Sequence, residues 1–209
     1  MFESIQISPS NSIHTATVDY SRIDEMFQFL TSTTIDLTHL ENITNEKRKA
    51  EWMFIREIIC KTMPQCEDIV YDEHRKPTFK ESDYYLSISH SNDRVAISID
   101  KKYQTGIDLQ FITDKIIRIK PKFLNEVEQS LTEKDPTELT CYWCIKEALF
   151  KIYGKKDAFL KENFNVQEFK FDGNKGSAIG VTEINDHYSL QPMEFRKLNN
   201  YILAYSVNY

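Results

Sequence analysis

Two short segments carry the residues best suited to chemistry. Gly106-Ile107-Asp108 closes a strand-like run, and Glu147 lies in the helix-like segment 143–151. Mg²⁺ in proteins is bound by oxygen atoms, commonly from one or two carboxylates, with water and substrate phosphate completing its shell. If the two segments meet, Asp108 and Glu147 would hold such a cation. Taken separately, they have ordinary alternatives: a strand-edge or helix-capping aspartate, and a surface Glu–Lys pair.

The spacing within the second segment places several functional groups together. Trp143, Glu147 and Lys151 recur every four residues and therefore share one face of a helix. Asp108 lies between Ile107 and Leu109, so strand alternation turns its side chain away from the face that these two share. A carboxylate and an ammonium group on one helical face suit the binding of a metal-bound phosphate.

Further cationic side chains stand at the starts of predicted elements. His90 lies between two serines, Lys76 follows a turn, and Lys47 and Arg48 open a helical pattern. Each has an alternative role, since a lone histidine often caps a turn and charged helix starts are commonly solvated. Together they supply the local positive charge that an anionic ligand needs.

Length and composition narrow the class of protein. The chain has 209 residues, of which 41% are hydrophobic, enough for a core in one large or two small domains. Its net charge of −6 argues against broad nucleic-acid binding. We expect no membrane association, because no apolar run reaches the ~20 residues of a span. The start, MFESIQISPS, lacks signal-peptide features, so we expect a cytoplasmic protein.

Cysteine spacing raises a rival interpretation. Cys141 and Cys144 form a C-x-x-C, a motif found in redox and metal proteins. No second C-x-x-C completes a zinc site, and the pair lies inside a helical pattern rather than at a helix N-terminus, where a thiolate would be stabilised. We therefore expect buried, reduced thiols, with a redox or metal protein as the rival that thiol titration and metal analysis would test.

The order of predicted elements indicates the fold class. Helical patterns are followed by strand patterns twice along the chain, which favours an α+β fold over a parallel doubly wound sheet. The predicted helices cover residues 20–31, 45–63, 113–120, 124–131 and 137–154. The predicted strands cover residues 84–89, 94–100, 104–110, 166–172, 177–183, 187–194 and 200–207.

Five elements in this order resemble the Sfp-type 4′-phosphopantetheinyl transferases, over residues 45 to 170. The last two, a G-[IV]-D motif and a W-x-x-K-E-[AS]-x-x-K helix at this spacing, are the most specific. The elements are the basic helix start at 47–52 followed by Arg56, the Lys76-Pro77 turn, Ser89-His90-Ser91, Gly106-Ile107-Asp108, and the helix ending at Lys151.

The resemblance implies both an activity and an architecture. The activity is Mg²⁺-dependent transfer of 4′-phosphopantetheine from coenzyme A to a serine of an acyl or peptidyl carrier protein. The architecture is a pseudo-dimer of two similar α+β halves, residues 1–102 and 103–209, each a small, mainly antiparallel sheet packed on helices. The second half carries the metal motif and the catalytic helix, and such an internally duplicated site permits a monomer.

Roles for individual residues also follow from the resemblance. Asp108 and Glu147 would bind Mg²⁺, Glu147 would accept the serine proton, and Lys151 would be catalytic by neutralising phosphate charge. The residues implied to bind coenzyme A phosphates are Lys47, Arg48, Lys76, Ser89, His90, Lys146 and Lys151. We expect carrier recognition on the basic segment 114–123.

One position departs from the family pattern. The family often has an acid two residues after the aspartate, where this chain has Gln110. An amide oxygen can coordinate Mg²⁺ or hold a water, but it brings no charge. We therefore keep Gln110 as a metal ligand, and we retain a non-catalytic module that binds coenzyme A or a carrier protein as the alternative.

Overall fold

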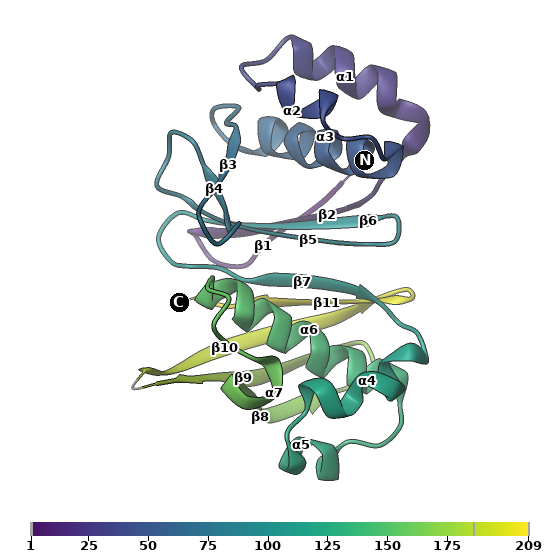
Figure 1. Ribbon diagram of the computed structural model, residues 1–209, viewed down its shortest axis with the longest axis vertical. Coiled ribbons are helices and arrows are strands. Elements are labelled where there is room, and N and C mark those ends of the chain that lie inside the picture. The colour runs from purple at the N-terminus through teal and green to yellow at the C-terminus, as the bar shows by residue number, and fades with distance from the viewer. Residues whose placement is uncertain (1, 186, 209) are drawn as a thin grey trace.

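The computed structural model describes residues 2–185 and 187–208, which form two stacked layers (Figure 1). Each layer is an antiparallel sheet packed on helices, so the predicted α+β fold is confirmed. Strands before residue 101 build a four-stranded sheet and a separate two-stranded hairpin, and strands after residue 106 build a five-stranded sheet. The sheets differ in strand number, and the similarity of the two halves and their boundary remain predictions.

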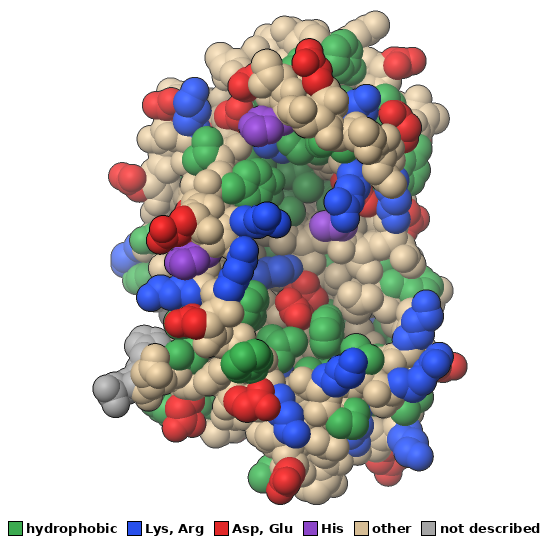
Figure 2. Space-filling model, viewed as in Figure 1, with side chains coloured by type: hydrophobic (Ala, Val, Ile, Leu, Met, Phe, Trp, Pro, Cys, Tyr) green, Lys and Arg blue, Asp and Glu red, His purple; other side chains and the backbone are tan. Residues whose placement is uncertain are grey.

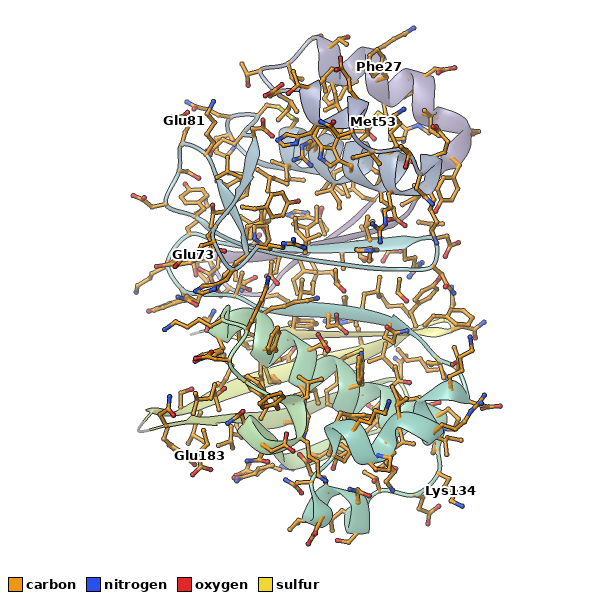
Figure 3. All side chains as sticks on the ribbon, in the orientation of Figure 1. Phe27, Met53, Glu73, Glu81, Lys134 and Glu183 are labelled. Atoms are coloured by element: carbon orange, nitrogen blue, oxygen red, sulfur yellow. A yellow bond between two sulfur atoms is a disulfide. The ribbon has the colours of Figure 1, made fainter. Side chains whose placement is uncertain are left out.

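The N-terminal layer has a four-stranded sheet covered by helices. Its strand order is β1-β2-β6-β5, formed by β1 (Glu3–Gln6), β2 (Asn11–Thr17), β6 (Arg94–Asp100) and β5 (Tyr85–Ser91). The remaining elements are a 3-10 turn (Tyr20–Arg22), α1 (Ile23–Thr31), α2 (Thr38–Glu41), α3 (Glu46–Thr62) and the hairpin β3 (Ile69–Tyr71) and β4 (Pro77–Phe79). Met53 of α3 is buried in this core, whereas Phe27 lies exposed on α1 (Figure 3).

The C-terminal layer has a five-stranded sheet. Its order is β7-β11-β10-β9-β8, formed by β7 (Ile107–Phe111), β11 (Tyr201–Ser206), β10 (His187–Leu198), β9 (Lys175–Ile184) and β8 (Phe164–Phe171). The helices are α4 (Lys115–Phe123), α5 (Glu126–Leu131), α6 (Pro136–Tyr153) and α7 (Leu160–Asn163). The long helix α6 lies across this sheet and packs on β7 and β11 (Figure 1).

Local sequence explains where α6 begins and how closely it approaches β7. Asp135 caps the helix by accepting from the Thr137 amide, and Gly154, with a φ of 77°, ends it. Gly106 precedes β7, and a Cβ atom added to Gly106 would lie 2.1 Å from the Ala148 carbonyl oxygen. Only glycine permits this contact, which brings the Asp108 strand against the Glu147 helix.

The two layers meet along β5 and β7, which are both edge strands of their own sheets. Three alternate serines of β5 accept hydrogen bonds from three alternate backbone amides of β7. We call them the serine ladder: Ser87 accepts from Ile107 at 3.1 Å, Ser89 from Leu109 at 3.0 Å, and Ser91 from Phe111 at 3.0 Å. The ladder satisfies amides that would otherwise be unpaired at a buried sheet edge.

The first two strands, the β3–β4 hairpin, α2 and α7 were not predicted. In β2, six of the seven residues are buried or half-buried, so the strand lacks the alternation that identifies half-exposed strands. His14 is an example of a polar residue at a buried position of β2, and its burial lowers its pKa to about 4.

The cysteines fall into two classes. Cys141 and Cys144 are buried and free, as predicted, and burial raises the pKa of the Cys144 thiol well above its usual range. Cys60 and Cys66 form a disulfide between the end of α3 and the loop that follows, which was not predicted.

Over the described residues, every helix is too short or too polar to cross a membrane.

Candidate active site

Asp108 and Lys151 form the centre of the site. The Asp108 side chain is buried on β7, and its Oδ1 atom accepts hydrogen bonds from Ser89 Oγ and Lys151 Nζ, each at 2.8 Å. Lys151 Nζ also donates to the Ile107 carbonyl oxygen at 2.8 Å. The Asp108 Oδ2 atom is buried and has no hydrogen-bond partner in the described part of the chain.

Glu147 lies one helical turn before Lys151 and shares its electrostatic environment. Burial, followed by the negative charge of Asp108, raises the pKa of Glu147 to about 7, and Lys151 offsets part of this shift. The site therefore holds two carboxylates, one of them paired with an ammonium group. A bound cation would relieve the repulsion between them.

These observations fit a hard cation such as Mg²⁺. A buried carboxylate oxygen without a partner, close to a second carboxylate, is a donor set that Mg²⁺ accepts when substrate oxygens and water complete its shell. Gln110 lies on the Asp108 side of β7, with its Nε2 atom 3.4 Å from its neighbour's carbonyl oxygen. Among residues 2–185 and 187–208, no group of three or more His, Cys, Asp or Glu side chains could hold a metal ion.

A pocket of about 820 Å³ lies between the two layers, beside Lys151. Its walls come from α3, the turn between β3 and β4, β5 and the end of α6, and Figure 2 shows basic side chains gathered around this part of the surface. Its cationic and histidine residues are Arg48, Arg56, Arg75, Lys76, Lys151, Lys155, Lys156, His74 and His90. Glu51 is the acid among the lining residues, so the pocket is strongly positive in a net-acidic chain.

Three of the predicted phosphate ligands line this pocket in addition to Lys151. Arg48 reaches it from the first turn of α3, and His90 from β5, with its Nε2 atom 4.0 Å from a Glu51 oxygen. Lys76 donates to the Gln104 side chain and to the Ile152 carbonyl oxygen, both at 3.0 Å, and thereby ties the N-terminal layer to the end of α6. Burial lowers the pKa of the Lys76 ammonium group.

The structure places three other predicted residues away from the pocket. Lys47 is exposed, with its Nζ atom 3.9 Å from a Glu51 carboxylate oxygen. Ser89 is buried, and its hydroxyl group donates to Asp108. Lys146 is fully buried, and its ammonium group lies 2.6 Å from Glu128. Adjacent helical residues point about 100° apart, so Lys146 faces the interior while Glu147 faces β7. Phosphate binding by Lys146 and Ser89 is therefore not supported by their positions.

Several residues that line the pocket had no role assigned to them from the sequence. Arg56 is 2% exposed, and its guanidinium lies over the Trp52 ring at 3.4 Å from the centroid. Burial lowers its pKa, and its closest carboxylate is Asp68, at 3.4 Å from Nε. The available signal was helical spacing, because Arg48, Trp52 and Arg56 recur every four residues. Lys155 and Lys156 follow the end of α6 and had no comparable signal.

Comparison with known proteins identifies similar chains. Residues 104–206 match the model of the 4′-phosphopantetheinyl transferase superfamily. The 4′-phosphopantetheinyl transferase AcpT of Salmonella typhi is 22% identical over 143 residues, which cover 65% of this chain and 71% of the relative. AcpT of Escherichia coli K12 is 25% identical over 116 residues, covering 55% of this chain and 58% of the relative. The matched region contains Asp108, Glu147 and Lys151.

Proposed function

The chain belongs to the 4′-phosphopantetheinyl transferase superfamily, and from this premise we propose that it transfers phosphopantetheine from coenzyme A to a serine of an acyl or peptidyl carrier protein. The observation that carries the proposal is the position of Lys151. This lysine both lines the basic pocket and contacts Asp108, so the anion site adjoins the carboxylate pair. An activity of the holo-acyl-carrier-protein synthase type fits this arrangement.

Coenzyme A matches the pocket in charge and in polarity. It carries a pyrophosphate and a 3′-phosphate, and Arg48, Lys76 and His90 offer donors for charge-assisted hydrogen bonds to phosphate oxygens. The apolar wall formed by Trp52, Ile55 and Ile88 offers a surface for the less polar parts of the ligand. A volume of about 820 Å³ lies within the range of pockets that enclose small molecules and cofactors.

The proposed reaction is a phosphoryl transfer. The carrier serine oxygen attacks the β-phosphorus of coenzyme A, forming a new P–O bond. The bond between that phosphorus and the bridging oxygen breaks, so the electron pair leaves with 3′,5′-adenosine bisphosphate. Glu147 accepts the serine proton as the general base of the site. Lys151 holds the phosphate oxygens in place through its ammonium group.

Asp108 and Glu147 would hold Mg²⁺, with the Gln110 amide oxygen as a neutral third donor. Bound there, Mg²⁺ would neutralise negative charge on the pyrophosphate oxygens. The rest of the site acts without it: Ser89 and Lys151 hold Asp108, and the basic residues around the pocket orient the ligand.

A labelling experiment tests the proposal. The protein is incubated with Mg²⁺, a coenzyme A whose pantetheine thiol carries a fluorophore, and a purified apo-carrier protein. We expect covalent label on the carrier, and none on a carrier whose acceptor serine is replaced by alanine. If the labelled coenzyme A binds but no carrier among fatty acid, polyketide and peptide synthase types is labelled, the chain is a binding module rather than a transferase.

A further inference from the structure

Ser89 makes two hydrogen bonds that run in opposite directions through one hydroxyl group. Its Oγ atom accepts from the Leu109 amide at 3.0 Å and lies 2.8 Å from Asp108 Oδ1. A serine hydroxyl has one hydrogen to donate, and an amide can only donate. The amide therefore fixes the direction of the second bond: the hydroxyl hydrogen points at the Asp108 carboxylate.

The second feature is where Ser89 comes from. It belongs to β5 of the N-terminal layer, whereas Asp108 belongs to β7 of the C-terminal layer. Alternation along β5 turns His90 to the pocket and Ser89 to β7. The same strand thus contributes a pocket side chain, His90, and a contact to the opposite layer from the adjacent residue, Ser89.

The third feature is the contrast between the two groups that hold Asp108 Oδ1. Lys151 lines the pocket and is charged, so a phosphate in the pocket competes with Asp108 for its ammonium group. Ser89 is buried and is absent from the pocket wall, so a ligand does not reach it. Because the hydroxyl is neutral, it also leaves the negative charge of Asp108 available to a cation.

We propose that Ser89 is the positioning residue of this site: its hydroxyl, held by the Leu109 amide, fixes the orientation of the Asp108 carboxylate from the opposite layer. This inference rests on the proposed function in that it treats Asp108 as a metal ligand. The fixed carboxylate presents its unpartnered Oδ2 atom to the cation whether or not Lys151 is engaged by phosphate. Residues that orient a metal ligand in this way typically change metal affinity or activity by about 10- to 100-fold when they are removed.

The serine ladder supplies a matched control. Ser91 is also buried and accepts from the Phe111 amide at 3.0 Å, but no carboxylate contact accompanies this bond among the described residues. Ser89→Ala and Ser91→Ala therefore each remove one hydroxyl that pairs a β7 amide. Only Ser89→Ala removes the donor to Asp108.

The test measures metal binding directly. Mn²⁺ is titrated into the full chain in the presence of coenzyme A, and free Mn²⁺ is followed by electron paramagnetic resonance. We expect Ser89→Ala to weaken Mn²⁺ binding by about tenfold or more, and Ser91→Ala to change it less than about twofold, with similar losses of melting temperature in both. Equal Mn²⁺ affinities in the two variants would overturn the proposal, because the ladder would then only dock the layers.

A second pair of variants guards against misfolding. Ser89→Thr and Ser89→Val have side chains of the same shape and differ only in the hydroxyl group. The threonine variant should bind Mn²⁺ more tightly than the valine variant, and equal affinities would contradict the proposal. If only the valine variant fails to fold, Ser89 is a folding residue and the proposal is likewise overturned.

The outcome is separable from that of the proposed function. Mn²⁺ binding needs no carrier protein and no turnover, so a protein that never labels a carrier still tests Ser89. Absence of Mn²⁺ binding in the wild-type protein would remove the metal site and the positioning role together, while the labelling experiment would still decide on transfer.

Discussion

Lys151 on α6 bonds to Asp108 on β7 across 2.8 Å, and this ion pair joins the helix and the strand that carry the site. The ammonium group is held additionally by the Ile107 carbonyl oxygen. Burial and the nearby Asp108 charge raise the pKa of Glu147 to about 7, and Lys151, which is paired with Asp108, offsets only part of this shift.

Glu147 should destabilise the metal-free protein at high pH. A carboxyl group with a folded pKa raised from 4.5 to about 7 contributes stability below pH 4.5 that is lost as the pH rises through 7. In the presence of a chelator, the free energy of unfolding of Glu147→Gln should therefore exceed that of wild type by about 3 kcal/mol at pH 8, with little difference at pH 4. Chemical denaturation at both pH values measures this, with Glu183→Gln on an exposed strand position as control. Equal stabilities of Glu147→Gln and wild type at pH 8 would show that the pKa of Glu147 is not raised in the folded protein.

Gln110 should limit metal affinity if it faces the cation. Gln110→Glu adds a negative charge two residues from Asp108 on the same side of β7, so the Mg²⁺ concentration for half-maximal transfer should fall. The measurement is a Mg²⁺ titration of the transfer rate, with Gln129→Glu on α5 as a control of equal charge change. An unchanged or higher half-maximal concentration would place Gln110 outside the metal site.

Lys146 should matter for folding and not for coenzyme A. It is 0% exposed, and its ammonium group bonds to Glu128 and to two backbone carbonyl oxygens. Lys146→Met therefore leaves the buried Glu128 carboxylate without its cationic partner. We expect a loss of about 3–5 kcal/mol in stability, with the coenzyme A affinity of the folded fraction unchanged. Lys151→Met should in contrast weaken coenzyme A binding in the folded fraction, because Lys151 lines the pocket, as calorimetric titration would reveal. A large affinity loss with intact stability in Lys146→Met would restore its predicted role as a phosphate ligand.

The carrier surface is expected on α4, where Lys115, Arg118 and Lys122 are exposed. Lys120 is excluded, because its ammonium group donates to the Gln129 and Thr132 carbonyl oxygens. Complementary charge acts mainly on the rate of encounter and is screened by salt. Reversing Arg118 and Lys122 to glutamate should therefore raise the KM for carrier severalfold, and the wild-type KM should rise with salt.

The control for this experiment reverses Lys170 and Lys175, which are exposed on the β8–β9 hairpin and give the same change in net charge. Coenzyme A affinity should be unchanged in both double variants. An equal effect of the two reversals on KM would indicate a general effect of net charge, and a loss of coenzyme A binding in the α4 variant would mean that this patch serves the nucleotide instead.

Sequence predicted the parts of the site that depend on local periodicity. The four-residue spacing of Glu147 and Lys151 fixed their common face, and strand alternation fixed the side of β7 on which Asp108 lies. No such guide exists in the sequence for residues whose partners are set by tertiary contacts. Ser89 and Lys146 carry a hydroxyl and an ammonium group that could serve a phosphate, and only the tertiary structure shows that their partners are Asp108 and Glu128.

The fold was predictable to a similar extent. Long helices gave clear periodic signals and β6 was marked by its β-branched residues. In contrast, β2 interrupts its apolar residues with Ser12, His14 and Thr15 and gave no signal. The Cys60–Cys66 disulfide and the Arg56–Trp52 stack depend on the packing of α3 against its surroundings, which the spacing of cysteines or of basic residues does not specify.

The central claim is that Asp108, Glu147 and Lys151 form the catalytic centre of a phosphopantetheine transfer beside a basic coenzyme A pocket. Intact mass spectrometry of an apo-carrier protein, incubated with coenzyme A, Mg²⁺ and this protein, tests it most directly. Wild type should add the mass of one phosphopantetheinyl group to the carrier, and a folded Asp108→Ala variant should add none in the same time. No mass gain with any carrier class, or equal gain with Asp108→Ala at limiting Mg²⁺, would contradict the account.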